Sequence, residues 1–123
     1  MESTYKYMKT DGQTDTTDMK IAYHVEAKEY VRAADLADKS GNNKLRDAIC
    51  DLGIASYGKL ADRMERHSTG SKNPTNFAAI ASVYAEMTKL CRIKGDAEAE
   101  KAYASKREAA DRECISIISA KRE

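Results

Sequence analysis

The sequence predicts an all-α fold, and two observations support this prediction. The chain has one proline, six glycines and many alanine, lysine, glutamate and arginine residues, a composition that favours helix over sheet. Apolar residues also recur at steps of three and four along four segments, each bounded by helix start or stop signals. Short turns after long helices favour antiparallel neighbours, so we expect a four-helix bundle made of two long helical hairpins.

The first expected hairpin joins a helix over residues 18–39 to a second helix that ends near His67. Gly41 supplies a left-handed stop after the first helix, and Asn42 or Asn43 caps the second. The core-facing stripe of the first helix has the spacing of one helix face and consists of Tyr23, Ala27, Tyr30, Ala34 and Ala37.

The second expected hairpin begins at Asn73, a good cap, with Pro74 at the first helical position, where its missing N–H costs nothing. Gly95 stops this helix, and Asp96 caps a last helix that runs to about residue 120. The apolar face of the third helix comprises Phe77, Ile80, Tyr84, Met87 and Leu90 or Cys91.

Residues 1–17 are polar and rich in threonine and aspartate, so we expect a flexible N-terminal arm that cannot fold alone. Tyr5 and Tyr7 are exceptions, because these aromatic side chains could dock on the body of the protein or on a partner. The remaining residues, 18–123, have the length of a single helical-bundle domain.

The charge balance, 21 lysine and arginine against 20 aspartate and glutamate, disfavours a general binder of nucleic acid or of membrane surfaces. No apolar run is long enough to span a bilayer. Lys101, Lys106, Arg107 and Arg112 are the candidates for nucleic-acid contact, but acids are interleaved with them, a mixture typical of a solvated helix face. The alternative function is a nucleic-acid-associated helical protein that uses a basic patch formed on folding.

The three cysteines are Cys50, Cys91 and Cys114, an odd number without a Cys-x-x-Cys spacing. This pattern indicates neither a disulfide framework nor a zinc site. The first residues also lack the apolar core of a secretory peptide. We expect reduced thiols and a cytoplasmic protein.

The stretch from Gly53 to Leu60 nearly matches a phosphate-binding loop, reading G-x-x-x-x-G-K. Leu60 replaces the Ser or Thr that would hold magnesium, and helical spacing, not a strand, precedes Gly53. We therefore interpret Gly53 and Gly58 as helix glycines that permit close packing.

Candidate catalytic groups are few. His24 and His67 are the only histidines and belong to no metal-binding spacing, so a di-iron bundle is not indicated. Spacing alone pairs no serine or cysteine nucleophile with a base. We expect a protein that is not an enzyme, with no metal and no cofactor, and the alternative is a small enzyme or ligand-binding bundle without a recognisable motif.

Surplus apolar surface favours protein–protein interaction. Ile54, Tyr57 and Ala61 give the second helix a further apolar face, which is either central in the bundle or a partner surface. Ile115 and Ile118 make the end of the last helix apolar over most of its circumference, as in a dimer seam or a docking site for the arm. We expect a helical interaction module, an adaptor or an inhibitor of a protein or complex, of the kind that phages and mobile elements encode, with a homodimer as one form of partner.

Overall fold

The computed structural model describes residues 16–121, which form five α-helices and no strand. The all-α prediction is confirmed for this part of the chain. The helices are α1 (Thr16–Glu26), α2 (Tyr30–Lys39), α3 (Asn43–Ser68), α4 (Pro74–Lys94) and α5 (Ala97–Lys121).

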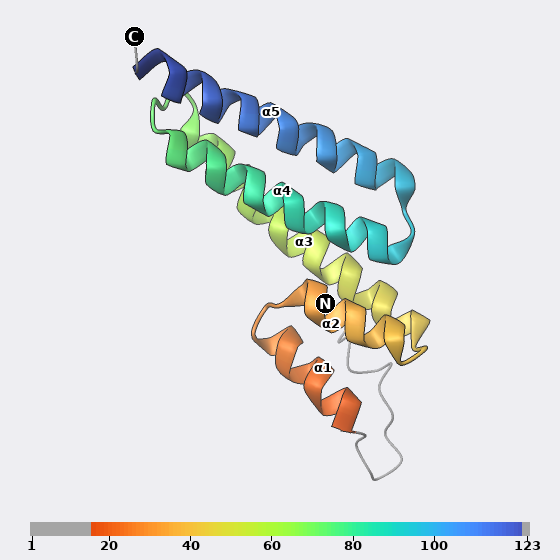
Figure 1. Cartoon of the computed structure of the whole chain (residues 1–123). Helices are drawn as coiled ribbons and strands as arrows, with labels where there is room; N and C mark the ends of the chain where they lie inside the picture. The colour runs from red at the N-terminus through yellow and green to blue at the C-terminus, as the bar shows by residue number, and fades with distance from the viewer. Residues whose placement is uncertain (1–15, 122–123) are drawn as a thin grey trace.

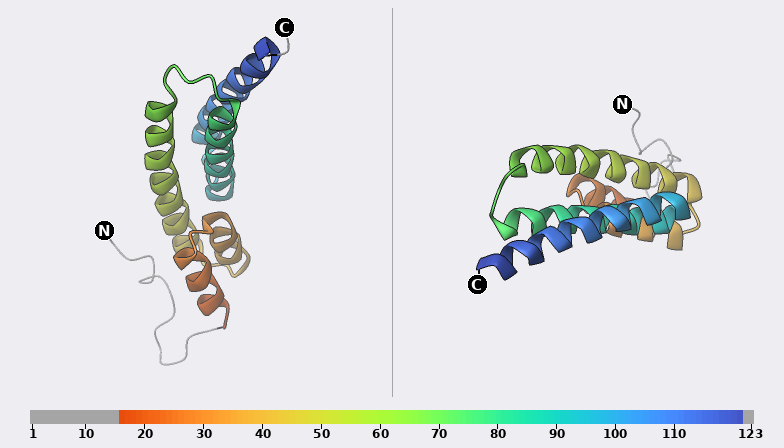
Figure 2. Two further views of the ribbon diagram at one scale, coloured as in Figure 1. Left: turned by 90° about the vertical axis from the view of Figure 1, so that its left-hand side faces the viewer. Right: turned by 90° about the horizontal axis from the view of Figure 1, so that it is seen from above.

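Three long helices and one short hairpin make up the structure. α3, α4 and α5 run side by side, while α1 and α2 fold into a hairpin beside the first half of α3 (Figures 1 and 2). Each helix packs on its neighbour in sequence, and α2 also contacts α4. Most of the arm expected over residues 1–17 lies outside the described residues, but α1 already begins at Thr16.

The predicted stops and caps of the later helices are confirmed. Gly41 and Gly95 have φ of 78° and 87°, the left-handed region in which glycine has no steric penalty. The capping oxygens of three side chains each accept a backbone N–H in the first turn: Asn42 from Leu45, Asn73 from Thr75 and Asp96 from Ala99.

The prediction of a single helix over residues 18–39 is wrong, because the chain turns sharply between α1 and α2. Lys28 has φ 60° and is the only residue other than glycine with a positive φ in the described range. The N–H groups of Lys28 and Glu29 donate to the carbonyls of Val25 and His24, at 3.0 and 2.8 Å. The same pattern closes α2 and α4, but there the left-handed residue is a glycine.

Two apolar stripes that are out of phase explain this break. On one continuous helix Ile21 and Tyr30 would lie nine residues apart, about 180° around the axis, so only one could face the core. The turn brings both inside, with exposed fractions of 0% and 6%. Tyr23, placed in the core by the predicted stripe, is instead 68% exposed, and Ala27 is exposed too.

Buried side chains form two clusters along α3. The N-terminal core joins α1, α2, the first half of α3 and one residue of α4: Ile21, Val25, Tyr30, Ala33, Ala34, Ala37, Leu45, Ile49, Cys50 and Leu90. The C-terminal core joins the second half of α3 to α4 and α5: Ala61, Ile80, Ala81, Val83, Tyr84, Met87 and Ala110. Ile54 and Tyr57 pack against both clusters, so the middle of α3 connects them.

Gly53 allows α2, α3 and α4 to approach one another beside this connection. Its backbone is buried, and a Cβ placed on it would lie 2.6 Å from Cδ1 of Leu90 and 2.8 Å from Cβ of Tyr30. Gly58, five residues later, is different: a Cβ there would meet only Cε of Met87, at 3.7 Å. The interpretation of Gly53 as a packing glycine is confirmed, and the segment that resembled a phosphate loop is helical throughout.

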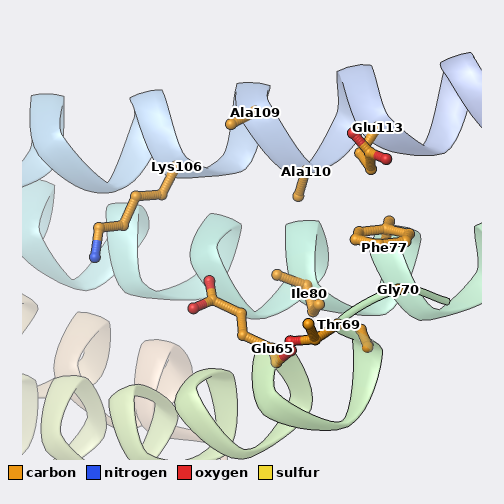
Figure 3. A pocket seen from close by; sticks show the side chains of 10 residues that line it. Glu65, Thr69, Gly70, Phe77, Ile80, Lys106, Ala109, Ala110 and Glu113 are labelled. Atoms are coloured by element: carbon orange, nitrogen blue, oxygen red, sulfur yellow. Dashed lines mark hydrogen bonds between the residues drawn. The ribbon is translucent and has the colours of Figure 1, made fainter.

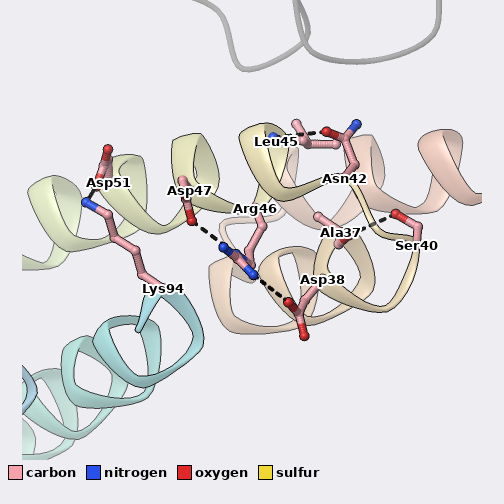
Figure 4. Close-up of polar contacts among 9 residues, drawn as sticks. All are labelled: Ala37, Asp38, Ser40, Asn42, Leu45, Arg46, Asp47, Asp51 and Lys94. Atoms are coloured by element: carbon pink, nitrogen blue, oxygen red, sulfur yellow. Dashed lines mark hydrogen bonds and ion pairs between the residues drawn. The ribbon is translucent and has the colours of Figure 1, made fainter. Parts of the chain in front are cut away.

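Ion pairs link the same helices at the surface, as Figure 4 shows. Arg46 of α3 donates to Asp38 of α2 at 2.8 Å and to its neighbour Asp47 at 3.0 Å. Lys94 at the end of α4 contacts Asp51 of α3 at 2.6 Å. Exposed pairs of this kind contribute at most about 1 kcal/mol each, so apolar burial around Gly53 dominates the stability of this region.

The two glycines of α3 should respond oppositely to alanine. Gly53→Ala places a methyl group against Tyr30 and Leu90, and overpacking should lower the free energy of unfolding by about 1–3 kcal/mol. Gly58→Ala gains helix propensity, and its methyl group meets only Cε of Met87 at an ordinary contact distance, so we expect an increase of about 0.5–1 kcal/mol. Denaturant unfolding measures both variants. Equal effects of the two substitutions would contradict the close approach at Gly53.

Candidate functional site

A groove lies over the first half of α4, between the end of α3 and the second half of α5 (Figure 3). It encloses about 530 Å³. Its floor is apolar, with Phe77 and Ile80 from α4 and Ala110 from α5. Its walls are mixed in charge: Glu65 stands on α3, and Lys106 and Glu113 stand on α5.

The groove continues along α5 toward the C-terminal end of the helix. A second hollow of about 360 Å³ shares Gly70, Phe77 and Glu113 with the first. Half of the α5 residues that line the combined groove have small side chains, which are Ala109, Ala110, Ser116 and Ala120. Small side chains leave the helix backbone accessible to whatever enters.

A hydrogen-bonded aromatic cluster lies beside the groove and shares Glu65 and Lys106 with its lining. The hydroxyl of Tyr84 donates to the carboxylate of Glu65, which ties α4 to α3. The ring of Tyr103 stacks on Tyr84 with centroids 6.3 Å apart, and Nζ of Lys106 lies 5.6 Å from the Tyr84 ring centroid. These contacts hold α3, α4 and α5 together at one point, and they fix the distance between the two walls.

Burial and the hydrogen bond to Glu65 both raise the pKa of Tyr84. The largest cause is desolvation, because this hydroxyl lies inside the cluster, and the negative carboxylate disfavours the phenolate further. Tyr84 therefore stays protonated as a hydrogen-bond donor. Burial also raises the pKa of the Cys50 thiol, to about 12, which keeps this cysteine as an unreactive thiol.

The structure places the predicted second apolar face of α3 inside the molecule. Ala61 is buried and Ile54 and Tyr57 are half-buried, all three in the packing of α3 against its neighbours. Of the two positions that the sequence left open, central placement and a partner surface, the structure therefore favours the first for these residues.

Ile115 and Ile118 are exposed on α5, with exposed fractions of 62% and 39%. Neighbouring Ile117 faces inward and is buried, and Cys114 is half-buried. Ile115 and Ile118 do not line the groove. They form a separate apolar spot on the outer side of α5.

The four basic candidates for nucleic-acid contact do not form one patch. Arg107 and Arg112 pair along α5 with Asp111 and Glu108, at 3.8 and 3.4 Å. Lys106 lies over Tyr84 at the groove, and Lys101 is exposed about 140° away around the helix. The predicted interleaving with acids thus becomes ion pairing on the helix surface.

Tyr5 and Tyr7 lie outside the described residues. The groove itself was not predicted, although Phe77, Ile80 and Tyr84 were assigned to the apolar face of their helix. The sequence signal for the groove is the row of small residues at positions 109, 116 and 120, on one side of α5. Their side chains are too small to fill the space between α3 and α5.

Within residues 16–121 no three His, Cys, Asp or Glu side chains are arranged to hold a metal ion. Cys50, Cys91 and Cys114 are free thiols. Among the helices described, none combines the length and the apolarity needed to cross a bilayer.

The chain matches no protein-family model, and no curated protein or solved structure shows significant similarity to it. The functional conclusion therefore depends on the geometry of the groove and its surroundings.

Alkaline pH should destabilise the protein through Tyr84. Since its folded pKa is raised, the unfolded tyrosine loses its proton above about pH 10 while the folded one keeps it, so stability falls as pH rises. Tyr84→Phe should make the slope of the unfolding free energy against pH shallower by the contribution of up to one proton, about 1.4 kcal/mol per pH unit. Urea unfolding between pH 8 and 11 measures it. Tyr103→Phe is the control, and an equally steep decline in Tyr84→Phe would contradict the assignment.

Proposed function

We propose that the protein is a non-enzymatic helical interaction module that binds an amphipathic helix of a partner protein in the groove between α3 and α5. The observation that carries this proposal is the groove itself, which has an apolar floor and charged walls and is formed by the three long helices α3, α4 and α5. An added helix in this position would give a four-helix arrangement around α4, the architecture that the sequence favours.

The groove suits a helix in length and in chemistry. From Lys106 to Lys121 the α5 wall covers about 22 Å at 1.5 Å per residue, enough for about four turns of a partner helix. Phe77 and Ile80 offer apolar contact to residues spaced three and four apart on that helix. Small residues on α5 permit close approach of a helix backbone.

The charges on the walls specify a partner with complementary side chains. Lys106 attracts an acidic residue near the Tyr84 end, while Glu65 and Glu113 attract basic residues along the rims. An adaptor or an inhibitor of a larger complex fits this mode of binding. Free thiols at Cys50, Cys91 and Cys114 fit a reducing compartment, so we place its action in the cytoplasm.

Substitution in the groove should abolish partner binding. Ala109 is exposed on the groove wall, and Ala109→Arg fills the groove with a long charged side chain without disturbing a buried residue. Ile115→Asp is the matched control on the outer side of the same helix. We expect affinity purification from the native host, after nuclease treatment, to recover one protein with wild type and with Ile115→Asp, and to lose it with Ala109→Arg.

Titration of the purified partner by calorimetry then confirms direct binding, with at least about a tenfold loss of affinity for Ala109→Arg. Loss of the partner with Ile115→Asp alone would assign binding to the outer spot and contradict the groove proposal. Recovery of nucleic acid that Lys101→Ala and Arg112→Ala abolish would favour the alternative function.

A further inference from the structure

The turn between α1 and α2 imposes a conformation that its residues disfavour. Lys28 has φ 60°, where a side chain with a Cβ is strained, in contrast to the glycines at the two equivalent turns. Ala27, Lys28 and Glu29 are all good helix formers. The local sequence therefore favours a continuous helix through residues 27–29.

Tertiary packing opposes this local preference. α1 packs mainly on α2 and adds Ile21 and Val25 to the N-terminal core. The side chain of His24 also contacts Glu29 at 3.1 Å across the turn. On a straightened helix Ile21 would face away from Tyr30, so a single chain could not bury both.

A second copy of the chain removes this conflict. α1 has 11 residues and α2 has 10, with the turn between them. In each copy α1 and α2 would form one straight helix, and the two straight helices would lie antiparallel about a twofold axis near residue 28. The α1 segment of each copy would then pack on the α2 segment of the other copy. Ile21 and Val25 would then enter the partner's N-terminal core, and Lys28 would adopt the helical conformation that it favours.

We propose that the α1–α2 turn is a hinge through which two copies of the chain exchange α1 and form a domain-swapped dimer. The groove between α3 and α5 takes no part in this exchange, so the dimer proposal is independent of the proposed function. Short strained hinges favour exchange of this kind, because the swapped form keeps the core contacts and relieves the hinge.

Substitutions at the hinge shift the balance in opposite directions. Lys28→Val makes the left-handed conformation more costly, because a β-branched residue is strained there, and should raise the dimerisation constant at least about tenfold. Lys28→Gly relieves the hinge in the monomer and should lower the constant by a similar factor. Lys59→Val, the same change at an exposed helical position of α3, should leave it unchanged. Light scattering across a concentration series measures all three.

A distance within one chain distinguishes exchange from any other dimer. Spin labels at Met19→Cys and Lys39→Cys, both exposed positions, are placed in a Cys114→Ser chain and diluted with unlabelled protein. A straightened helix separates these Cα positions by about 30 Å, whereas the hairpin keeps them near the spacing of packed helices, about 10 Å. A dimer with the long distance supports the proposal. A Lys28→Val protein that stays monomeric, or a dimer that keeps the short distance, would overturn it.

Discussion

At Gly53 the backbone of α3 comes so close to Tyr30 of α2 and Leu90 of α4 that no side chain fits between them. Tyr30 and Leu90 belong to the N-terminal core, and the contact is adjacent to Ile54 and Tyr57, which pack against both clusters. Neither cluster is large alone. Within residues 16–121 the short α1–α2 hairpin packs in the N-terminal core, and α5 packs against the C-terminal core.

The groove is a consequence of how α5 is held. α5 packs along the length of α4, but only two of its residues, Ala110 and Ile117, are buried. Alanine and serine on the side toward α3 leave space above α4 that the chain itself does not fill. The Tyr84–Glu65 hydrogen bond ties the α3 wall to α4, and the contacts of Tyr103 and Lys106 with the Tyr84 ring tie α5 to the same point, so the groove is a defined part of the fold and not a gap between independent helices.

Much of the helical framework could be predicted from local signals. The stops at Gly41 and Gly95 and the caps at Asn42, Asn73 and Asp96 depend on chemistry within a few residues, which a single sequence contains. The break at Lys28 could not be predicted in this way, because no glycine or proline marks it. It arises from a tertiary requirement, the burial of Ile21 together with Tyr30.

The candidate site was less predictable for the same reason. Ile54, Tyr57 and Ala61 have the pattern of a partner surface, but the pattern cannot show that α2 and α4 cover them. A groove is defined by side chains that fail to fill a space between helices. Its recognition therefore requires the arrangement of α3, α4 and α5, whereas Phe77 and Ile80 alone resemble ordinary core residues.

Native-state hydrogen exchange along α3 tests most directly whether the middle of this helix, from Gly53 to Tyr57, couples the two cores. If it does, the amides between Cys50 and Tyr57 exchange only through global unfolding, with the free energy and denaturant dependence measured for the whole protein. Amides near Gly53 that exchange faster than those near Ile49 and Ala61, by an opening insensitive to denaturant, would show that the two halves of α3 unfold separately and would contradict this account.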